Sequence, residues 1–162
     1  MVFAIIVHLC ACLTGGTHGS IKSYDFFVSK NTLQKAVEKI LTESPDIHKD
    51  TVKNYIVNIT SGKNDTIMNN QYNDGQQYVT IKIEGKVKGE ESEFTFQYVG
   101  DEKDWDTLKT SSLSIAYAYD EKNNGGSNGN GGLSYSPLLK KKIIRLFETR
   151  FINRIKKELT GK

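Results

Sequence analysis

Four stretches of the chain place apolar residues at every second position, and two others repeat them at helical spacing. Strict alternation over several residues predicts β-strands with one buried face. The alternating residues are Tyr55, Val57 and Ile59; Val79, Ile81 and Ile83; Phe94, Phe96 and Tyr98; and Leu113, Ile115, Tyr117 and Tyr119. All four strands have one apolar face, and their order along the chain predicts a single antiparallel meander.

The first stretch with helical spacing is expected to form a helix over residues 31–44. Its apolar stripe consists of Leu33, Ala36, Val37, Ile40 and Leu41. Asn31 and Gln34 have the spacing of a capping box, and Ser44-Pro45 ends the pattern. The helix therefore needs a sheet or a second helix against which to bury this stripe.

A second, longer helix is expected over residues 137–159, with Ser136 as its N-cap and Pro137 at its first position. Gly161 is suited to terminate it. Its slightly drifting apolar stripe consists of Ile143, Ile144, Phe147, Phe151, Ile155 and Leu159. An amphipathic helix of this kind packs one side on the core and leaves the other in solvent.

These elements predict one α+β domain over residues 21–162. We expect a two-layer sandwich, with an antiparallel four- or five-stranded meander and both helices on one face, in the order (β)-α-β-β-β-β-α. The bracketed strand is an edge strand within residues 21–28. The opposite sheet face is expected to be flat and polar, lined by Ser112, Ser114, Ala116 and Ala118 beside Thr80, Lys82 and Thr95.

An apolar run over residues 2–13 precedes this domain. Because a membrane-spanning helix needs about 20 apolar residues, the run is too short to be one. Its length, and the small polar residues after it, are typical of the central region of a secretory signal peptide.

The segment Leu9-Cys10-Ala11-Cys12 resembles the lipobox of bacterial lipoproteins. The resemblance implies a signal peptide over residues 1–11, an acylated Cys12 and a flexible tether over residues 12–20. The pattern departs from the family because no Lys or Arg precedes the apolar run, which suggests a true start upstream of Met1. The alternative is an ordinary signal peptide cut nearer Gly19, which would give a secreted protein.

Positive charge is concentrated at the end of the chain. Residues 138–162 carry nine Lys or Arg against two Glu, while the remaining residues are net acidic. The candidates for contact with anionic lipid headgroups or lipopolysaccharide are Lys140, Lys141, Lys142, Arg145, Arg150 and Arg154. The alternative is a solvated outer face of a packed helix. Nucleic acid is not an expected partner, because the chain is exported.

Few residues of the expected domain suit catalysis. Both cysteines lie in the signal region and His18 lies in the tether, which leaves His48 as the domain's one histidine. Thiol or hydroxyl nucleophiles need a positioned base, and histidine-based zinc sites need several ligands. We therefore expect no catalytic residue, no metal and no cofactor.

Two loops raise alternatives. Residues 101–106 place four carboxylates around Trp105, which suits either calcium or a paired-carboxylate hydrolase, although the EF-hand pattern is absent. A solvated acidic loop is favoured. The Gly- and Asn-rich residues 123–132 lack the motifs of a phosphate-binding loop, so they favour a flexible connector.

A second resemblance covers nearly the whole exported chain. It is similar to small uncharacterised lipoproteins of Bacteroides-type bacteria in residues 98–105, in the run from Tyr119-Asp120 to Gly132, and in the helix from Phe147-Glu148 to Leu159. The family implies no known activity and no functional residues.

The sequence thus predicts a lipid-anchored module of the bacterial envelope, on the outer membrane and either periplasmic or surface-facing. It would not be an enzyme, and would bind an envelope protein or a glycan of unknown identity. The alternatives are a carboxylate-dependent hydrolase and an inhibitor or immunity-type protein.

Overall fold

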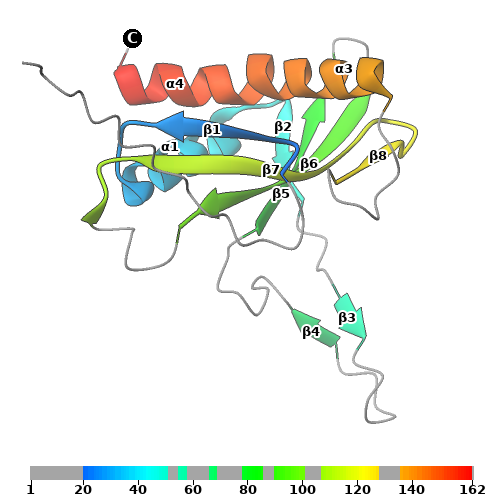
Figure 1. Cartoon of the computed structure of the whole chain (residues 1–162), viewed down its shortest axis with the longest axis horizontal. Helices are drawn as coiled ribbons and strands as arrows, with labels where there is room; N and C mark the ends of the chain where they lie inside the picture. Colours follow the sequence, from blue (N-terminus) through cyan, green and yellow to red (C-terminus); the bar gives the residue numbers. More distant parts are fainter. Residues whose placement is uncertain are drawn as a thin grey trace, which may run out of the picture.

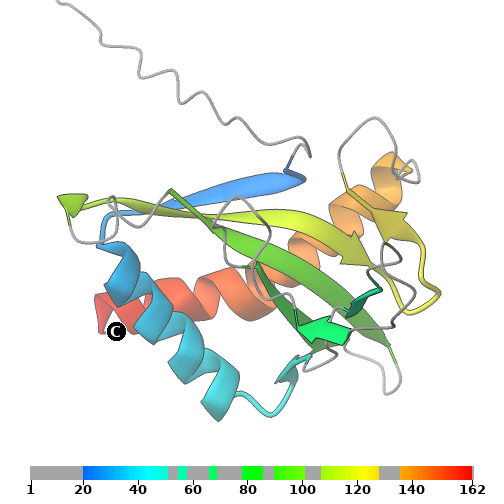
Figure 2. The ribbon, with the colours of Figure 1, turned by 90° about the horizontal axis from the view of Figure 1, so that it is seen from below.

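An antiparallel sheet covered on one face by helices forms the centre of the structure (Figures 1 and 2). The structure is a computed structural model, and it describes residues 20–50, 55–57, 66–68, 78–85, 90–100, 107–127 and 136–161. The two-layer α+β architecture predicted from the sequence is confirmed.

The main sheet has the strand order β1-β7-β6-β5-β2, and β8 pairs with β7 off this path. The strands are β1 (Lys22–Phe26), β2 (Ile47–Lys49), β5 (Tyr78–Glu84), β6 (Glu91–Val99), β7 (Ser111–Tyr119) and β8 (Gly125–Gly126). All pairings are antiparallel. The edge strand expected within residues 21–28 is β1.

The first of the alternating stretches does not join this sheet. Its residues form β3 (Tyr55–Val57), which pairs with β4 (Thr66–Met68) in a separate two-stranded sheet. The main sheet ends instead at β2, three residues that directly follow the first helix and its turn. A strand of three residues is too short to show an alternating pattern, so the sequence did not reveal it.

The first helix, α1 (Lys30–Glu43), begins one residue earlier than expected. Its N-cap is Ser29, whose hydroxyl accepts a hydrogen bond from the Thr32 backbone N–H at 3.3 Å. The predicted capping box at Asn31 and Gln34 is therefore wrong, because Asn31 already lies inside the helix. The helix ends at Ser44, as predicted.

The C-terminal helix has three parts: α3 (Pro137–Phe147), the π-helical turn η2 (Glu148–Ile152) and α4 (Asn153–Thr160). Ser136 caps it and Gly161 ends it in the left-handed conformation, as predicted. The buried residues Phe147, Phe151 and Ile155 repeat every four positions, so on a regular helix of 3.6 residues per turn they would drift around the axis. The wider π-helical turn offsets this drift and keeps all three on the sheet.

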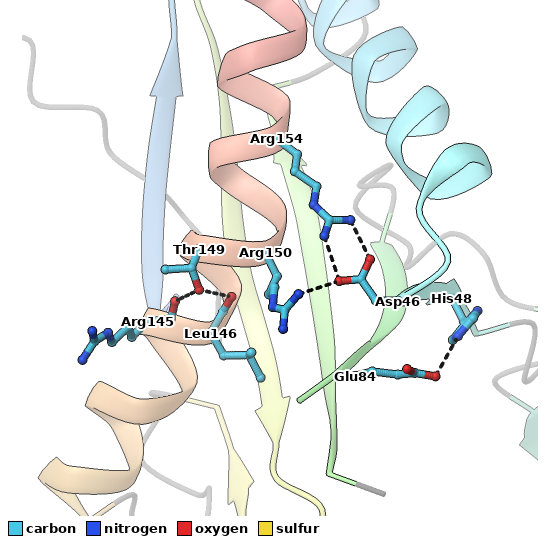
Figure 3. Close-up of polar contacts among 8 residues, drawn as sticks. All are labelled: Asp46, His48, Glu84, Arg145, Leu146, Thr149, Arg150 and Arg154. Atoms are coloured by element: carbon cyan, nitrogen blue, oxygen red, sulfur yellow. Dashed lines mark hydrogen bonds and ion pairs between the residues drawn. The ribbon is translucent and has the colours of Figure 1, made fainter. Parts of the chain in front are cut away.

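A side chain helps to open this turn. The Thr149 hydroxyl donates to the carbonyl oxygens of Arg145 and Leu146, at 2.7 and 3.2 Å (Figure 3). In a regular helix these oxygens would accept from the backbone N–H groups four residues later, so the hydroxyl competes with the helix ladder.

Phe147 is at the centre of the core between the two layers. Its ring lies 4.9 Å from that of Phe94 and 5.2 Å from that of Phe151, measured between centroids, and all three side chains are fully buried. Tyr24 on β1 reaches the same ring from the sheet edge. The core residues thus join β1, β6 and the C-terminal helix.

A β-bulge in β7 changes the faces of its last residues. Phe96 is paired with Ile115 whereas Thr95 is paired with Tyr117, so Ala116 is the extra residue. The predicted apolar face of Tyr117 and Tyr119 is therefore wrong. Both tyrosines lie on the face away from the helices, while Ala118 is fully buried opposite Phe94.

Candidate functional site

The sheet face away from the helices is the first candidate site. The described C-terminal helix packs on the opposite face (Figure 1). We call it the open face, and define it by Ser112, Ser114, Tyr117 and Tyr119 on β7, Glu93, Thr95 and Gln97 on β6, and Thr80, Lys82 and Glu84 on β5. Compared with the sequence prediction, it loses Ala116, the extra residue of the bulge, and Ala118, and it gains the two tyrosines.

Side-chain hydroxyls link the strands across the open face. Thr80 and Thr95 lie 2.9 Å apart between their hydroxyl oxygens, and Ser23 and Ser114 lie 2.6 Å apart. Next to them, Ser112 donates to Asp25 at 2.6 Å. Such cross-strand pairs stabilise the sheet and hold the polar groups of this face in fixed positions.

One acceptor on the open face receives no donor from the residues that the structure describes. The Gln97 side-chain oxygen is buried and accepts no hydrogen bond from this part of the chain. In the sheet, Gln97 is paired with Tyr78 on β5 and with Ser114 on β7. A buried, unsatisfied acceptor costs about 1–3 kcal/mol, so this oxygen lowers the stability of the sheet at this position.

Charged residues occupy the β2 side of the open face. Lys82 lies 3.6 Å from both Asp50 and Glu91, and these two carboxylates raise the pKa of its ammonium group. The pKa of Glu93 is also raised, first by burial and then by the charge of Asp50. Carboxylates held close together in this way favour contact with a cationic or hydrogen-bond-donating partner.

His48 is also on this side of the sheet. Its Nε2 lies 3.4 Å from Glu84, and both side chains are more than half exposed (Figure 3). The partner of the imidazole is thus a carboxylate and not a hydroxyl or thiol that it could activate as a nucleophile. The sequence-based interpretation of His48 as a surface residue is consistent with this placement.

The six residues predicted to contact anionic headgroups all lie on the C-terminal helix. In the structure they form two groups, and the first group is bound to Asp46. Arg154 donates two hydrogen bonds to Asp46, at 2.7 and 2.8 Å, and Arg150 donates a third at 3.1 Å (Figure 3). The hydrogen bond from Arg154 lowers the pKa of the Asp46 carboxyl, and the charges of both arginines add to this effect against the opposing effect of burial. These two arginines therefore hold the fold together.

The other candidates lie on α3. Lys141 and Arg145 are exposed, and Lys140 is half-buried. Lys142 is 3.7 Å from Glu121, although its side chain is 56% exposed. An open concavity of about 490 Å³ follows this side of the helix, lined by Pro137, Lys140, Lys141, Ile144, Arg145 and Glu148.

A second open concavity, of about 510 Å³, lies between α1 and α4. It is lined by Lys39, Ile40, Glu43, Ser44, Arg154, Lys157, Glu158 and Gly161. Both oxygens of Glu158 accept from Lys39, at 2.8 and 2.9 Å. This ion pair joins α1 to α4. Because both of its oxygens accept from Lys39, Glu158 is not a candidate catalytic carboxylate.

Several predicted features lie outside the described residues. These are the signal region with Cys12, the acidic loop over residues 101–106 and the end of the Gly-rich run, residues 128–132. Within the described residues, no three His, Cys, Asp or Glu side chains are grouped to hold a metal ion. None of the helices described has the length and apolarity to cross a membrane.

Sequence reasoning missed Asp46 and the two tyrosines for different reasons. Asp46 stands alone in a turn after Ser44-Pro45, and its arginine partners are more than 100 residues away. Tyr117 and Tyr119 fitted the period-two pattern, which contains no signal of a bulge. No family model, curated protein or solved structure matches the chain.

Proposed function

We propose that this chain is a bacterial envelope lipoprotein, held by an acyl group on Cys12, whose domain binds a partner through the open face of its sheet. The observation that carries this proposal is the open face itself, a polar surface with two half-buried tyrosines on the side of the sheet away from the C-terminal helix. The partner is an envelope protein or a glycan.

The chemistry of the open face supports a binding role. Tyrosine side chains bring a large contact area and a hydroxyl at low entropic cost, so they are enriched where proteins bind other molecules. Tyr117 and Tyr119 are half-buried beside Thr95 and Glu93, with which they are paired in register. Together they offer stacking surfaces and hydroxyl groups on one sheet.

The position of the concavities favours this role over hydrolysis. A glycoside hydrolase needs two carboxyl groups that face each other across a cleft deep enough to hold the substrate. The two concavities described above lie on the helical layer, whereas Glu93, the half-buried carboxylate with a raised pKa, lies on the open face. A polar sheet face with exposed hydroxyl and carboxyl groups is suited to binding a partner.

The anchor and the binding face are tested separately in the host envelope. Mass spectrometry of the mature N-terminus is expected to find a diacylglyceryl modification on Cys12. A free N-terminus near Ser20 would contradict the anchor and make the protein a secreted one.

The binding face is tested with a photo-crosslinking amino acid at Tyr119 and, as the matched control, at Thr42, an exposed residue of α1. A discrete crosslinked product is expected from Tyr119 and not from Thr42. Equal labelling at both positions, or none at Tyr119, would show that the open face is not the binding surface.

A further inference from the structure

We propose that the outer side of α3 is a contact surface for anionic lipid headgroups, so that the domain rests on the membrane with its open face turned away. This inference builds on the lipid anchor of the proposed function, and adds the orientation in which the anchor holds the domain.

Four exposed residues form a stripe along α3. Leu138, Lys141, Lys142 and Arg145 follow the i, i+3, i+4, i+7 spacing that places residues on one side of a helix. Leu138 is 80% exposed although it is apolar. An apolar side chain beside three cations is the combination that lets a surface helix bind at the level of lipid headgroups. We call these four residues the basic stripe.

The charge of the basic stripe is not neutralised by the rest of its helix. Glu148 is the one acidic residue of the helix over residues 137–152, and it is already paired with Lys22 at 2.5 Å. Arg150 and Arg154, by contrast, are bound to Asp46. Of the six cationic candidates, those that Asp46 does not bind therefore lie on α3, where Lys142 has a 3.7 Å contact with Glu121 but stays 56% exposed.

The tether enters the domain beside the basic stripe. The ion pair between Lys22 and Glu148 joins the first residue of β1 to the turn that follows α3. Between Cys12 and Ser20 the chain can span at most roughly 28 Å, at about 3.5 Å per residue. An acyl group on Cys12 would thus keep this end of the C-terminal helix close to the lipid surface.

The two sides of the domain differ in charge. The helices cover one face of the sheet, and the open face lies on the other side of the molecule (Figure 2). The open face and its margin carry Asp50, Glu84, Glu91 and Glu93 against Lys82, so their net charge is negative and an anionic surface would repel it. With the basic stripe against the membrane, the open face points into the aqueous compartment, where a partner can reach it.

The orientation can be measured with the acylated protein in vesicles. Its two native cysteines are Cys10, in the signal region, and the acylated Cys12, so a cysteine introduced at Asn153 is the one reactive thiol of the mature chain. A fluorophore at Asn153, on the outer side of the helix, is expected to be quenched by nitroxide-labelled lipid. The same fluorophore at Glu84, on the open face, is expected to be quenched much less.

The charge dependence separates the basic stripe from the anchor. Quenching at Asn153 is expected to be stronger in vesicles of phosphatidylcholine with phosphatidylglycerol than in phosphatidylcholine alone. Lys141→Gln with Arg145→Gln is expected to shift the balance between resting and lifted orientations about 30-fold toward the lifted one. Lys109→Gln with Lys122→Gln removes the same charge from exposed loop residues, and is expected to leave the quenching unchanged.

Two results would overturn the inference. One is equal quenching at Asn153 and Glu84, and the other is an equal effect of the two double variants, which would show that only net charge matters. The mass of the Cys12 peptide is measured on the same samples. An acylated protein without the expected orientation refutes the basic stripe alone, whereas an unacylated chain refutes the anchor.

Discussion

Asp46 and Arg154 are 108 residues apart in the chain and meet through two parallel hydrogen bonds of 2.7 and 2.8 Å (Figure 3). Asp46 lies in the turn between α1 and β2, and Arg154 lies on α4. A bidentate pair of this kind is stronger and more directional than a single contact between charged groups. It fixes the C-terminal helix to the edge of the sheet where β2 pairs with β5.

Asp46→Asn is expected to destabilise the fold by about 1–2 kcal/mol, because it removes a charge that two arginines share in a partly buried position. Chemical denaturation measures this loss. Glu38→Gln, which breaks the exposed pair with Lys49, is the control and is expected to cost less than about 0.5 kcal/mol. Equal losses in the two variants would show that the Asp46 cluster has no special role.

Because of the Asp46 carboxylate, the stability of the fold is expected to depend on pH in the acid range. Its pKa in the folded state lies below the ordinary value of 3.8, mainly because Arg154 donates to it. Its contribution to stability is therefore complete above the pKa of the unfolded chain and is lost as the pH falls through the lower, folded value. The difference in unfolding free energy between wild type and Asp46→Asn is expected to shrink when the pH falls below about 4. A difference that stays constant down to pH 2 would contradict this assignment.

The sequence predicted the parts of the fold that depend on long periodic patterns. Both helices and the meander of β5, β6 and β7 follow from repeated apolar positions, because these residues must be buried against the other layer. The three-residue β2 and the single extra residue of the bulge leave no periodic signal, because they depend on contacts between distant segments.

Ala118→Leu tests the register that the bulge creates. The side chain of Ala118 is fully buried opposite Phe94, so a larger residue would overpack the core and cost about 1–3 kcal/mol. Tyr119→Leu, on the open face, is expected to cost less than about 1 kcal/mol. If the alternation of the sequence continued without a bulge, the two effects would be reversed. Thermal unfolding of both variants decides between these registers.

Gly125 lies on β8, where it pairs with Tyr119 at the end of β7. Its φ of 150° is one that side-chain-bearing residues rarely adopt, and a Cβ there would overlap the carbonyl oxygen of Ala118. Gly125→Ala is expected to destabilise the protein by about 3 kcal/mol or more. Gly161→Ala is the matched control, since φ is also positive but the Cβ would meet open space, and its cost is expected to be about 1 kcal/mol. Equal melting temperatures would show that β8 does not contribute to the fold.

The candidate site was less predictable than the fold. The polar residues of β5 and β6 were placed correctly on the open face because alternation alone assigns them. The pKa of Glu93 is raised first by burial and then by the charge of Asp50, the residue after β2, which lies far from β6 in the sequence. Likewise, Asp46 determines which cations of the C-terminal helix are bound within the fold, namely Arg150 and Arg154. In both cases a distant residue determines whether a charge is paired or available.

Glu93→Gln tests whether the open face is kept for binding at the expense of stability. Burial and the charge of Asp50 raise the pKa of Glu93, so its contribution to stability is complete below the ordinary value of 4.5 and falls as the pH rises through the folded value. At neutral pH the variant is expected to be about 0.5 kcal/mol more stable than wild type, after allowance for screening by solvent, and the gain should vanish below about pH 4. The crosslinking yield at Tyr119 is expected to fall in the same variant, because the partner would lose a charged acceptor. A variant that gains stability and keeps its full crosslinking yield would place the binding surface elsewhere on the domain.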